Sequence, residues 1–191
     1  TGRVVRKNVK ENEDVYDLQV LNNHNFFAND ILVHNCGEIL LRDKEFCNLS
    51  EVIIRGTDTE EEIGEKIRIA TILGTWQSTL TNFKYLSKKW KENCEEERLL
   101  GVSLTGIMDN ELTNGKKPGL QQRLEKWKKI AIDTNKELAD NIGIPASVAI
   151  TCGKPSGTVS QLTDSASGIH ARHNPYYIRT VRADKKDPLA K

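Results

Sequence analysis

The stretch Leu99-Leu100-Gly101-Val102-Ser103-Leu104-Thr105-Gly106-Ile107-Met108 decides how the larger part of this chain folds. It is short and mostly apolar, which predicts a strand buried inside a sheet. Gly101 and Gly106 interrupt the run, and a glycine within a strand indicates that another part of the molecule approaches the backbone closely. We therefore expect a buried strand over 99–108 that has a close neighbour at its glycines.

Two long helical patterns lie on either side of this stretch. Thr59 and Glu62 form a capping-box signature, and after it apolar residues recur at helical spacing: Ile63, Ile67, Ala70, Leu73, Trp76 and Leu80. A second stripe is stopped by Gly143 and Pro145 and contains Leu120, Leu124, Trp127, Ala131, Thr134, Leu138 and Ile142. Residues 146–151 predict another short buried strand. Strands that alternate with helices predict an α/β layer or barrel built on parallel strands.

Composition excludes little. The 191 residues are 29% charged and 37% hydrophobic with a net charge of +1, which predicts one ordinary domain plus a small appendage and no nucleic-acid or membrane partner. No apolar run approaches the roughly 18 residues of a spanning helix, so a cytoplasmic location is expected. Both ends look cut from something longer, and we treat the chain as a fragment.

The cysteines do not form a recognisable framework. There are four, at positions 36, 47, 94 and 152, too few and too irregular for a set of structural disulfides. No Cys-x-x-Cys pair is present, so no metal site is expected. Cys94 and Cys152 in particular are expected to be buried thiols, or thiols without a chemical role, in a reducing compartment.

A glycine-containing turn follows the strand expected at 146–151. The residues from Cys152 to Ser160 combine backbone N–H groups and hydroxyls at a helix start, which can cradle a phosphate. They do not form a P-loop, because Pro155 follows Lys154. Taken alone, this stretch favours a structural turn over an anion site. A later polar stretch either lines an active site or caps its rim, and it contains His170, Arg172 and His173.

The first 35 residues have a different character. Tyr16, Leu18 and Val20 alternate with polar residues, which predicts a half-buried strand. Turns are expected at 22–23 and 28–30, followed by the short apolar run 31–33. This hairpin-like piece has too little apolar surface to fold alone, so another segment must complete it.

Residues 15–20, 24–26 and 31–36 together resemble the C-terminal splicing motif of inteins. An asparagine amide can attack its own backbone carbonyl and cut the following peptide bond when imidazoles supply acid and base. The resemblance implies that Asn35 cyclises, that His34 polarises the carbonyl or protonates the leaving amine, that His24 activates the amide and that Asp17 orients the junction. Cys36 would be the nucleophile that begins the downstream segment.

The N-terminal splicing nucleophile of that family is absent from this chain. Splicing therefore requires an intein N-terminal half, either upstream or on a split partner. The expected fold of residues 1–35 is a short β segment of an intein (Hint-type) domain.

From Cys36 onward, four motifs in order are similar to those of adenosylcobalamin-dependent, class II ribonucleotide reductases. They are Cys36-Gly37-Glu38-Ile39 with Phe46-Cys47-Asn48-Leu49-Ser50-Glu51-Val52, Leu99 to Asp109, Pro155-Ser156-Gly157-Thr158-Val159-Ser160, and Ser167-Gly168-Ile169-His170-Ala171-Arg172 to Tyr176-Tyr177-Ile178-Arg179. Four separate motifs in the same order are much stronger evidence for this resemblance than any single motif.

This resemblance implies a radical reaction that removes the ribose 2′-hydroxyl, supplying deoxyribonucleotides for DNA replication. A thiyl radical on Cys36, formed with adenosylcobalamin, would abstract the 3′ hydrogen, and Glu38 would act as general base. Cys47 would reduce the substrate and end as a disulfide with an upstream cysteine, which a thioredoxin-like partner reopens. Ser156, Gly157, Thr158 and Val159 would bind the phosphates of a ribonucleoside di- or triphosphate.

The two resemblances divide the chain into residues 1–35, an intein segment, and residues 36–191, part of a reductase catalytic domain. The implied fold of the second part is an incomplete ten-stranded α/β barrel, which needs the upstream reductase segment. In one hypothesis the chain is a reductase piece with its intein tail attached. In the other it is an autoprocessing module of a split intein, and residues 36–191 are passive cargo.

Overall fold

The computed structural model describes the backbone of residues 3–8, 14–19, 25–28 and 31–34, and both backbone and side chains of residues 39, 41–178 and 186. The elements in chain order are β1 (Arg3–Asn8), β2 (Asp14–Gln19), β3 (Asn25–Ala28), β4 (Ile31–His34), β5 (Asn48–Ile53), α1 (Glu60–Gln77), α2 (Lys88–Glu97), β6 (Leu100–Thr105), the 3-10 turn η1 (Ile107–Asp109), α3 (Leu120–Ile142) and α4 (Val159–Leu162).

The N-terminal strands form two separate antiparallel pairs. β1 pairs with β2 in a register that sets Val5 opposite Asp17, and β3 pairs with β4 in a register that sets Asn25 opposite His34. The strand predicted around Tyr16 is confirmed, as is the antiparallel pairing on either side of 29–30. β1 was not predicted, because its sequence is rich in charge and lacks clean alternation. The turn expected at 22–23 lies outside the described residues.

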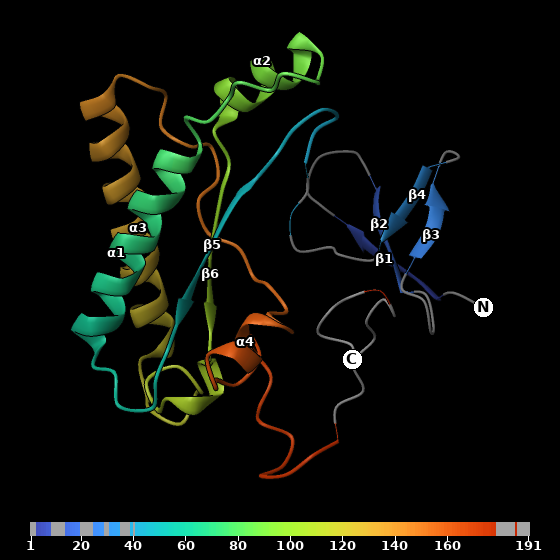
Figure 1. Ribbon diagram of the computed structural model, residues 1–191. Helices are drawn as coiled ribbons and strands as arrows, with labels where there is room; N and C mark the ends of the chain where they lie inside the picture. The colour runs from blue at the N-terminus through green and yellow to red at the C-terminus, as the bar shows by residue number, and fades with distance from the viewer. Residues whose placement is uncertain are drawn as a thin grey trace.

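β5 and β6 form a parallel two-stranded sheet, with Asn48 opposite Leu100 and Ile53 opposite Thr105. Their side chains alternate between two faces, as strand geometry requires. Val52, Leu100 and Val102 belong to the buried core, which also contains residues of α1 and α3. Both helices lie on this side of the sheet, and α4 lies across the sheet from them (Figure 1). The α/β class is therefore confirmed, and the ten-stranded barrel stays a prediction.

α1 begins where the sequence predicts. The Thr59 hydroxyl accepts a hydrogen bond from the Glu62 amide at 3.2 Å, and the Glu62 carboxylate accepts one from the Thr59 amide at 2.8 Å. The apolar stripe is confirmed only over its first half. Leu73, Trp76 and Leu80 are exposed, while the buried positions shift to Thr71, Gly74 and Thr75. Gly74 lets Leu100 of β6 approach closely, so small residues replace large ones there.

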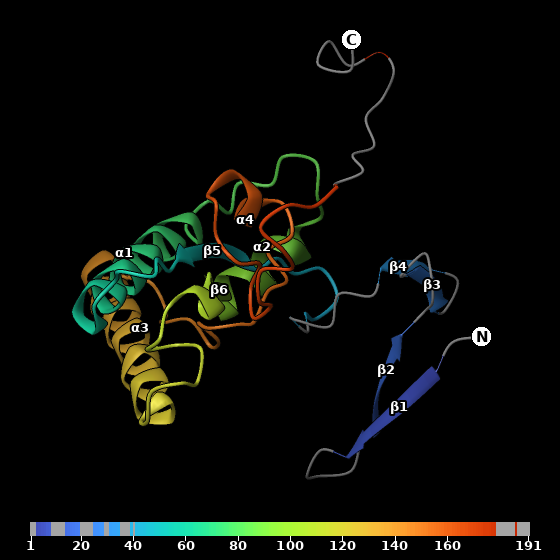
Figure 2. The same ribbon diagram turned by 90° about the horizontal axis from the view of Figure 1, so that it is seen from below.

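α3 packs along α1, and the two helices lie side by side in both views (Figure 2). Trp127 is almost fully buried between the helices and donates a hydrogen bond from Nε1 to the Glu60 carbonyl. The helix ends at Gly143, which has a φ of +72° in the left-handed region that favours glycine. The predicted stop is thus confirmed. Leu124 and Ile142, two members of the predicted stripe, are exposed.

The strand expected at 146–151 is wrong in extent and burial. Thr151 alone forms a parallel bridge, with Val102, although the preceding backbone also bonds to β6. Ile150 is buried, but Val148 and Thr151 are exposed. The segment borders the described sheet on its outer side, so alternate side chains lack a covering layer. Within the part of the chain described here, no helix is long and apolar enough to cross a membrane.

Candidate functional site

Of the residues to which the sequence assigned a catalytic, splicing or phosphate-binding role, the structure describes Cys47 and residues 156–159 with their side chains. Asp17 lies in β2 and His34 is the last residue of β4. His24, Asn35, Cys36 and Glu38 fall outside the described residues. The geometry that follows therefore concerns the face of the sheet that carries Cys47 and the loop that contains Ser156.

The sheet face turned away from α1 and α3 is polar. Gly101, Ser103 and Thr105 of β6 alternate with the core residues of that strand, and Glu51 occupies the matching face of β5. Both carboxylate oxygens of Glu51 are buried and have no hydrogen-bond partner among the described residues. A buried carboxylate without a partner is strongly unfavourable. This face is therefore suited to receive a further chain segment or a polar ligand.

Cys47 lies immediately before β5 and faces Cys152, which follows the bridge at Thr151. A β-carbon added at Gly101 would stand 3.3 Å from the Cys47 sulfur and 3.1 Å from the Cys152 sulfur. The two sulfurs therefore approach the same point above a bare glycine. No local sequence pattern pairs them, since they are 105 positions apart. The close approach predicted for Gly101 is confirmed, and its partners are these two thiols and Leu49.

The environment of Cys47 keeps its thiol protonated. Burial is the main cause that raises the pKa of Cys47 to about 11, with smaller contributions from the neighbouring Cys152 and Glu45 and an opposing one from Lys154. At neutral pH this thiol can therefore donate a proton, but it is a weak nucleophile. Cys94 is buried, as expected, and its sulfur accepts a hydrogen bond from the Phe46 amide at 3.3 Å.

The loop between Cys152 and α4 has an unusual conformation at Ser156. This residue has a φ of +50°, is 7% exposed, and has a buried hydroxyl without a hydrogen-bond partner among the described residues. Gly157, Thr158 and Val159 are exposed, and within the described residues their amides have no acceptor, as in the first turn of any helix. The loop thus presents free donors beside an unsatisfied hydroxyl.

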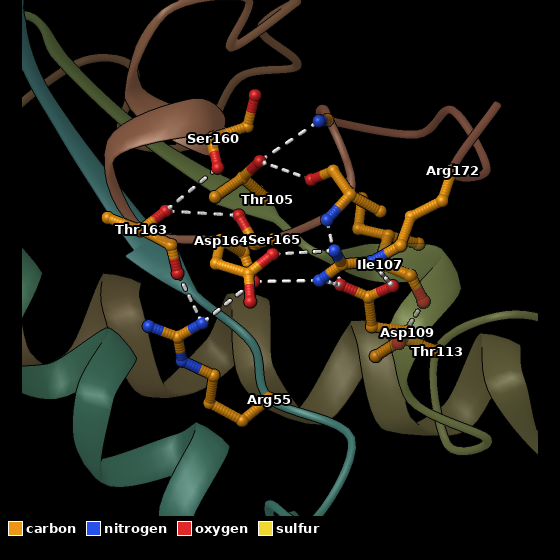
Figure 3. Close-up of polar contacts among 12 residues, drawn as sticks. Arg55, Thr105, Ile107, Asp109, Thr113, Ser160, Thr163, Asp164, Ser165 and Arg172 are labelled. Carbon is orange, nitrogen blue, oxygen red and sulfur yellow. Dashed lines mark hydrogen bonds and ion pairs between the residues drawn. The ribbon is translucent and has the colours of Figure 1, made fainter. Parts of the chain in front are cut away.

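A polar network attaches the segment after α4 to the ends of β5 and β6 (Figure 3). Asp109 accepts a hydrogen bond from the Ala166 amide at 2.7 Å, and its two carboxylate oxygens receive the Arg172 guanidinium at 3.0 and 3.2 Å. Thr105 donates to the Ala166 carbonyl and accepts from the Gly168 amide. Because strand and turn residues hold both sides of this segment, α4 is fixed over the polar face.

The same guanidinium also reaches Asp164. Arg172 donates to the Asp164 carboxylate and to its carbonyl, both at 2.7 Å, and Arg55 donates to the Thr163 and Asp164 carbonyls (Figure 3). Asp164 and Arg172 border a pocket of about 580 Å³ between α4 and residues 171–177. The sequence indicated Arg172 as a candidate site residue but did not reveal its ion-pair partners. Asp109 and Asp164 were missed because the pairing depends on the tertiary fold.

This network predicts a specific response to acid. Burial alone would raise the pKa of Asp109, but the hydrogen bonds from Arg172 and the Ala166 amide outweigh it and lower the pKa below its ordinary value. A carboxyl with a lowered folded-state pKa stabilises the fold above its unfolded-state pKa, about 4, and loses that contribution as the pH falls through the folded value. We expect Asp109→Asn to lower the free energy of unfolding at pH 7 and to flatten its decline below about pH 4.

The measurement is urea unfolding between neutral pH and pH 2, followed by circular dichroism. Asp133→Asn is the matched control, because Asp133 is exposed on α3 and its only ion pair with another described residue, Lys129, is 3.8 Å long. We expect that variant to follow the wild type. An Asp109→Asn profile parallel to the wild-type profile would show that the Arg172 contact does not favour the ionised carboxyl.

Among the described residues, no group of three or more His, Cys, Asp or Glu side chains is placed to hold a metal ion. No protein-family model matches the chain. Individual proteins do match it. The adenosylcobalamin-dependent ribonucleoside-triphosphate reductase of Lactobacillus acidophilus is 29% identical over 181 residues, and that of Lactobacillus leichmannii is 26% identical over 178 residues.

These relatives are adenosylcobalamin-dependent reductases. Each alignment covers 81% of this chain and 24% of the relative, so the chain spans about a quarter of the length of the curated relatives it matches. The fold agrees with this similarity. A crystal structure of a B12-dependent, class II ribonucleotide reductase matches with a TM-score of 0.55 at 23% identity, covering 72% of this chain and 22% of the other. The described α/β unit thus has the fold of a part of that enzyme.

Proposed function

We propose that this chain contributes part of the catalytic barrel of an adenosylcobalamin-dependent ribonucleotide reductase, and that Cys47 is one of its reducing thiols. The observation that carries the proposal is the position of Cys47. It lies on the polar face of a parallel sheet, beside Cys152 at the start of the loop that contains Ser156, in a unit whose sequence relatives are such reductases. If residues 36–191 were only passive cargo of an intein, this position of Cys47 would have no explanation.

The protonation of Cys47 suits that role. Replacing a ribose hydroxyl by hydrogen, with release of water, requires two protons and two electrons, and two thiols supply them when they become a disulfide. A thiol with a pKa of about 11 still carries its proton at neutral pH and can pass it to the leaving oxygen. The second thiol would come from the upstream reductase segment. Cys36 as the radical residue and Glu38 as the general base belong to the same proposal, on sequence alone.

Residues 156–159 would bind the substrate phosphates. The exposed amides of Gly157, Thr158 and Val159 and the unpartnered Ser156 hydroxyl supply donors that an anion requires. The Ser167 hydroxyl, in the segment that follows α4, donates to the Pro155 and Ser156 carbonyls and so ties this loop to that segment. The site would take a ribonucleoside di- or triphosphate.

The remaining parts of the proposal concern what lies beyond the described residues. The buried Glu51 carboxylate indicates that the polar face is covered in the complete protein, in agreement with a barrel interior of ten strands. The pocket beside α4 does not fit the cobalamin, because its charged side chains, Asp164 and Arg172, are already paired with each other. We therefore assign no described residue to that cofactor and derive no step through it.

The test is to produce the protein with the upstream reductase segment that the proposal requires and with residues 1–35 removed, so that Cys36 follows that segment directly. We expect it to form deoxyribonucleotides from ribonucleotides when adenosylcobalamin and a thioredoxin-class dithiol are supplied. Cys47→Ser should reduce repeated turnover to the level of a blank without protein. Product is measured by chromatography of the nucleotides.

Cys94→Ser is the matched control, because Cys94 is a buried thiol that contacts the neighbouring Phe46 backbone. It should retain turnover. A folded, complete protein that forms no deoxyribonucleotide, or a Cys47→Ser variant that turns over normally with the dithiol, would contradict the proposed function.

We further propose that residues 1–35 are the C-terminal splicing segment of an intein, because the chain pairs as hairpins up to the cleavage point. β4 ends at His34, opposite Asn25 of β3, and Asn35 and Cys36 follow directly. This places a histidine at the end of a strand, beside the bond to be cut. The test is whether the bond between Asn35 and Cys36 breaks when an intein N-terminal half is supplied.

A further inference from the structure

A turn between the two cysteines of the proposed reaction is held by α2. Residues 42–46 join the segment that contains Cys36 to Cys47, which precedes β5. α2 lies at the end of the sheet where β5 begins, apart from the layer of α1 and α3 (Figure 1). Its only buried residues are Asn93 and Cys94, and both contact this turn. The part of the core that the structure describes contains no residue of α2. The buried side chains of α2 therefore serve the turn and not the core.

Asn93 bonds to the backbone at the middle of the turn. Its side-chain amide donates to the Asp43 carbonyl at 2.8 Å and to the Lys44 carbonyl at 3.3 Å. Lys44 has a φ of +58°, in the left-handed region that favours glycine, so the turn needs contacts that hold it. The next residue of α2, Cys94, accepts a hydrogen bond from the Phe46 amide at 3.3 Å. Asn93 and Cys94 thus hold the middle and the end of the turn.

Arg42 holds the beginning of the turn among three carboxylates. Its backbone amide donates to the Glu45 carboxylate at 3.0 Å, and its guanidinium donates to the other Glu45 oxygen at 3.3 Å. The guanidinium also donates to Glu96 at 3.1 Å and to the Asn93 carbonyl at 3.3 Å, and it lies 3.0 Å from Glu97. The Glu45 side chain is fully buried, and a buried carboxylate needs a cation beside it. Arg42 therefore keeps Glu45 inside the turn and joins the turn to α2.

We propose that Arg42 and Asn93 are positioning residues for the reductase reaction, because they fix the turn that sets the separation of Cys36 from Cys47. This inference rests on the proposed function. The two thiols would act on neighbouring carbons of one ribose, so both must reach it together. A displacement of about 1 Å can cost about a hundredfold in rate. Neither positioning residue would touch the substrate.

Substrate binding should not depend on this turn. The proposed phosphate-binding residues 156–159 are tied to the segment after α4 through Ser167, whose hydroxyl donates to the Ser156 carbonyl at 3.1 Å. Loss of the contacts in the turn should therefore lower kcat and leave KM for the ribonucleotide nearly unchanged. A general loss of structure would instead affect both constants.

The first measurement uses the 191-residue chain and needs no turnover. Hydrogen exchange is followed by mass spectrometry of peptic peptides that cover residues 42–47, where the Arg42 and Phe46 amides are hydrogen-bonded. We expect Asn93→Ala to speed exchange there about tenfold, because its two hydrogen bonds to the turn are lost. Exchange in α1 and α3 should stay as in the wild type, which shows that the variant is folded.

The second measurement uses the complete protein, with the upstream reductase segment joined to Cys36. We expect Arg42→Gln and Asn93→Ala each to lower kcat about a hundredfold, with KM changed by less than about threefold. Arg68→Gln is the matched control, because this guanidinium donates twice to Glu65, both at 2.8 Å, and both residues lie on α1. It should keep the wild-type kcat and the wild-type exchange at 42–47.

Arg42→Lys keeps the charge that Glu45 requires but loses the planar fork that reaches α2, and it replaces Arg42→Gln if that variant does not fold. We expect it to have an intermediate kcat. A complete wild-type protein that forms no deoxyribonucleotide contradicts the proposed function and this role with it. An active wild type whose turn variants keep its kcat, or an exchange rate at 42–47 that Asn93→Ala does not change, overturns the positioning role alone.

Discussion

Replacing Asn35 by alanine is expected to abolish cleavage of the peptide bond between Asn35 and Cys36. The wild-type chain is mixed with a matching intein N-terminal half that carries a reporter peptide, and intact masses are recorded over time. We expect a ligated product in which the reporter is joined to Cys36 and residues 1–35 are released. The loss in Asn35→Ala should be complete, because alanine has no side-chain amide to attack its carbonyl.

A second variant separates the two steps of this reaction. Cys36→Ala removes the nucleophile that accepts the reporter but leaves the Asn35 amide intact. It should therefore release residues 1–35 without ligating the reporter. If the wild-type chain is not cleaved by any cognate half, or if Asn35→Ala still cleaves at Cys36, residues 1–35 have another role. The reductase proposal would be unaffected by that outcome, since it rests on residues from Cys36 onward.

Local patterns predicted the elements of the fold well. The capping box at Thr59, the stop at Gly143 and the start of the buried strand after Leu99 were correct because each depends on residues near one another in sequence. The strand was predicted too long, because it ends at Thr105 and a 3-10 turn follows at Ile107–Asp109. The second half of α1 was predicted wrongly. Its buried face is set by Leu100, which packs onto Gly74, and helical spacing alone does not reveal that partner.

The candidate site was only partly predictable for the same reason. Cys47 and Ser156 were identified from local motifs, but the meeting of Cys47 with Cys152 depends on the order of three strand segments. The contacts that join Asp109 to Arg172 span 63 positions and leave no local signal. Gly101 was informative in the sequence, because a glycine within a strand indicates that another segment approaches closely. It does not indicate which residues approach.

Gly106, at the other end of β6, also indicates a close approach to the backbone. We expect its replacement to have a large effect on stability. Its φ of +76° is strained for any other residue, and an added β-carbon would stand 2.3 Å from the Ile54 carbonyl oxygen. That oxygen belongs to rigid backbone, because the Ile54 amide donates to the Thr105 carbonyl at 2.9 Å. The Gly106 amide also donates to the Ala166 carbonyl at 2.8 Å, so a shift disturbs the segment after α4 as well.

We therefore expect Gly106→Ala to lower the free energy of unfolding by about 3 kcal/mol or more, combining backbone strain with the displaced strand contacts. Urea unfolding of the chain measures this. Gly115→Ala is the matched control: its φ is +84°, but nothing lies within 4 Å of the added carbon, so only the conformational strain of about 1 kcal/mol should appear. Equal losses in the two variants would show that the contact with Ile54 is not tight. A larger loss at Gly106, together with faster proteolysis after α4, would show that this glycine joins β5 and β6 to the segment that follows α4.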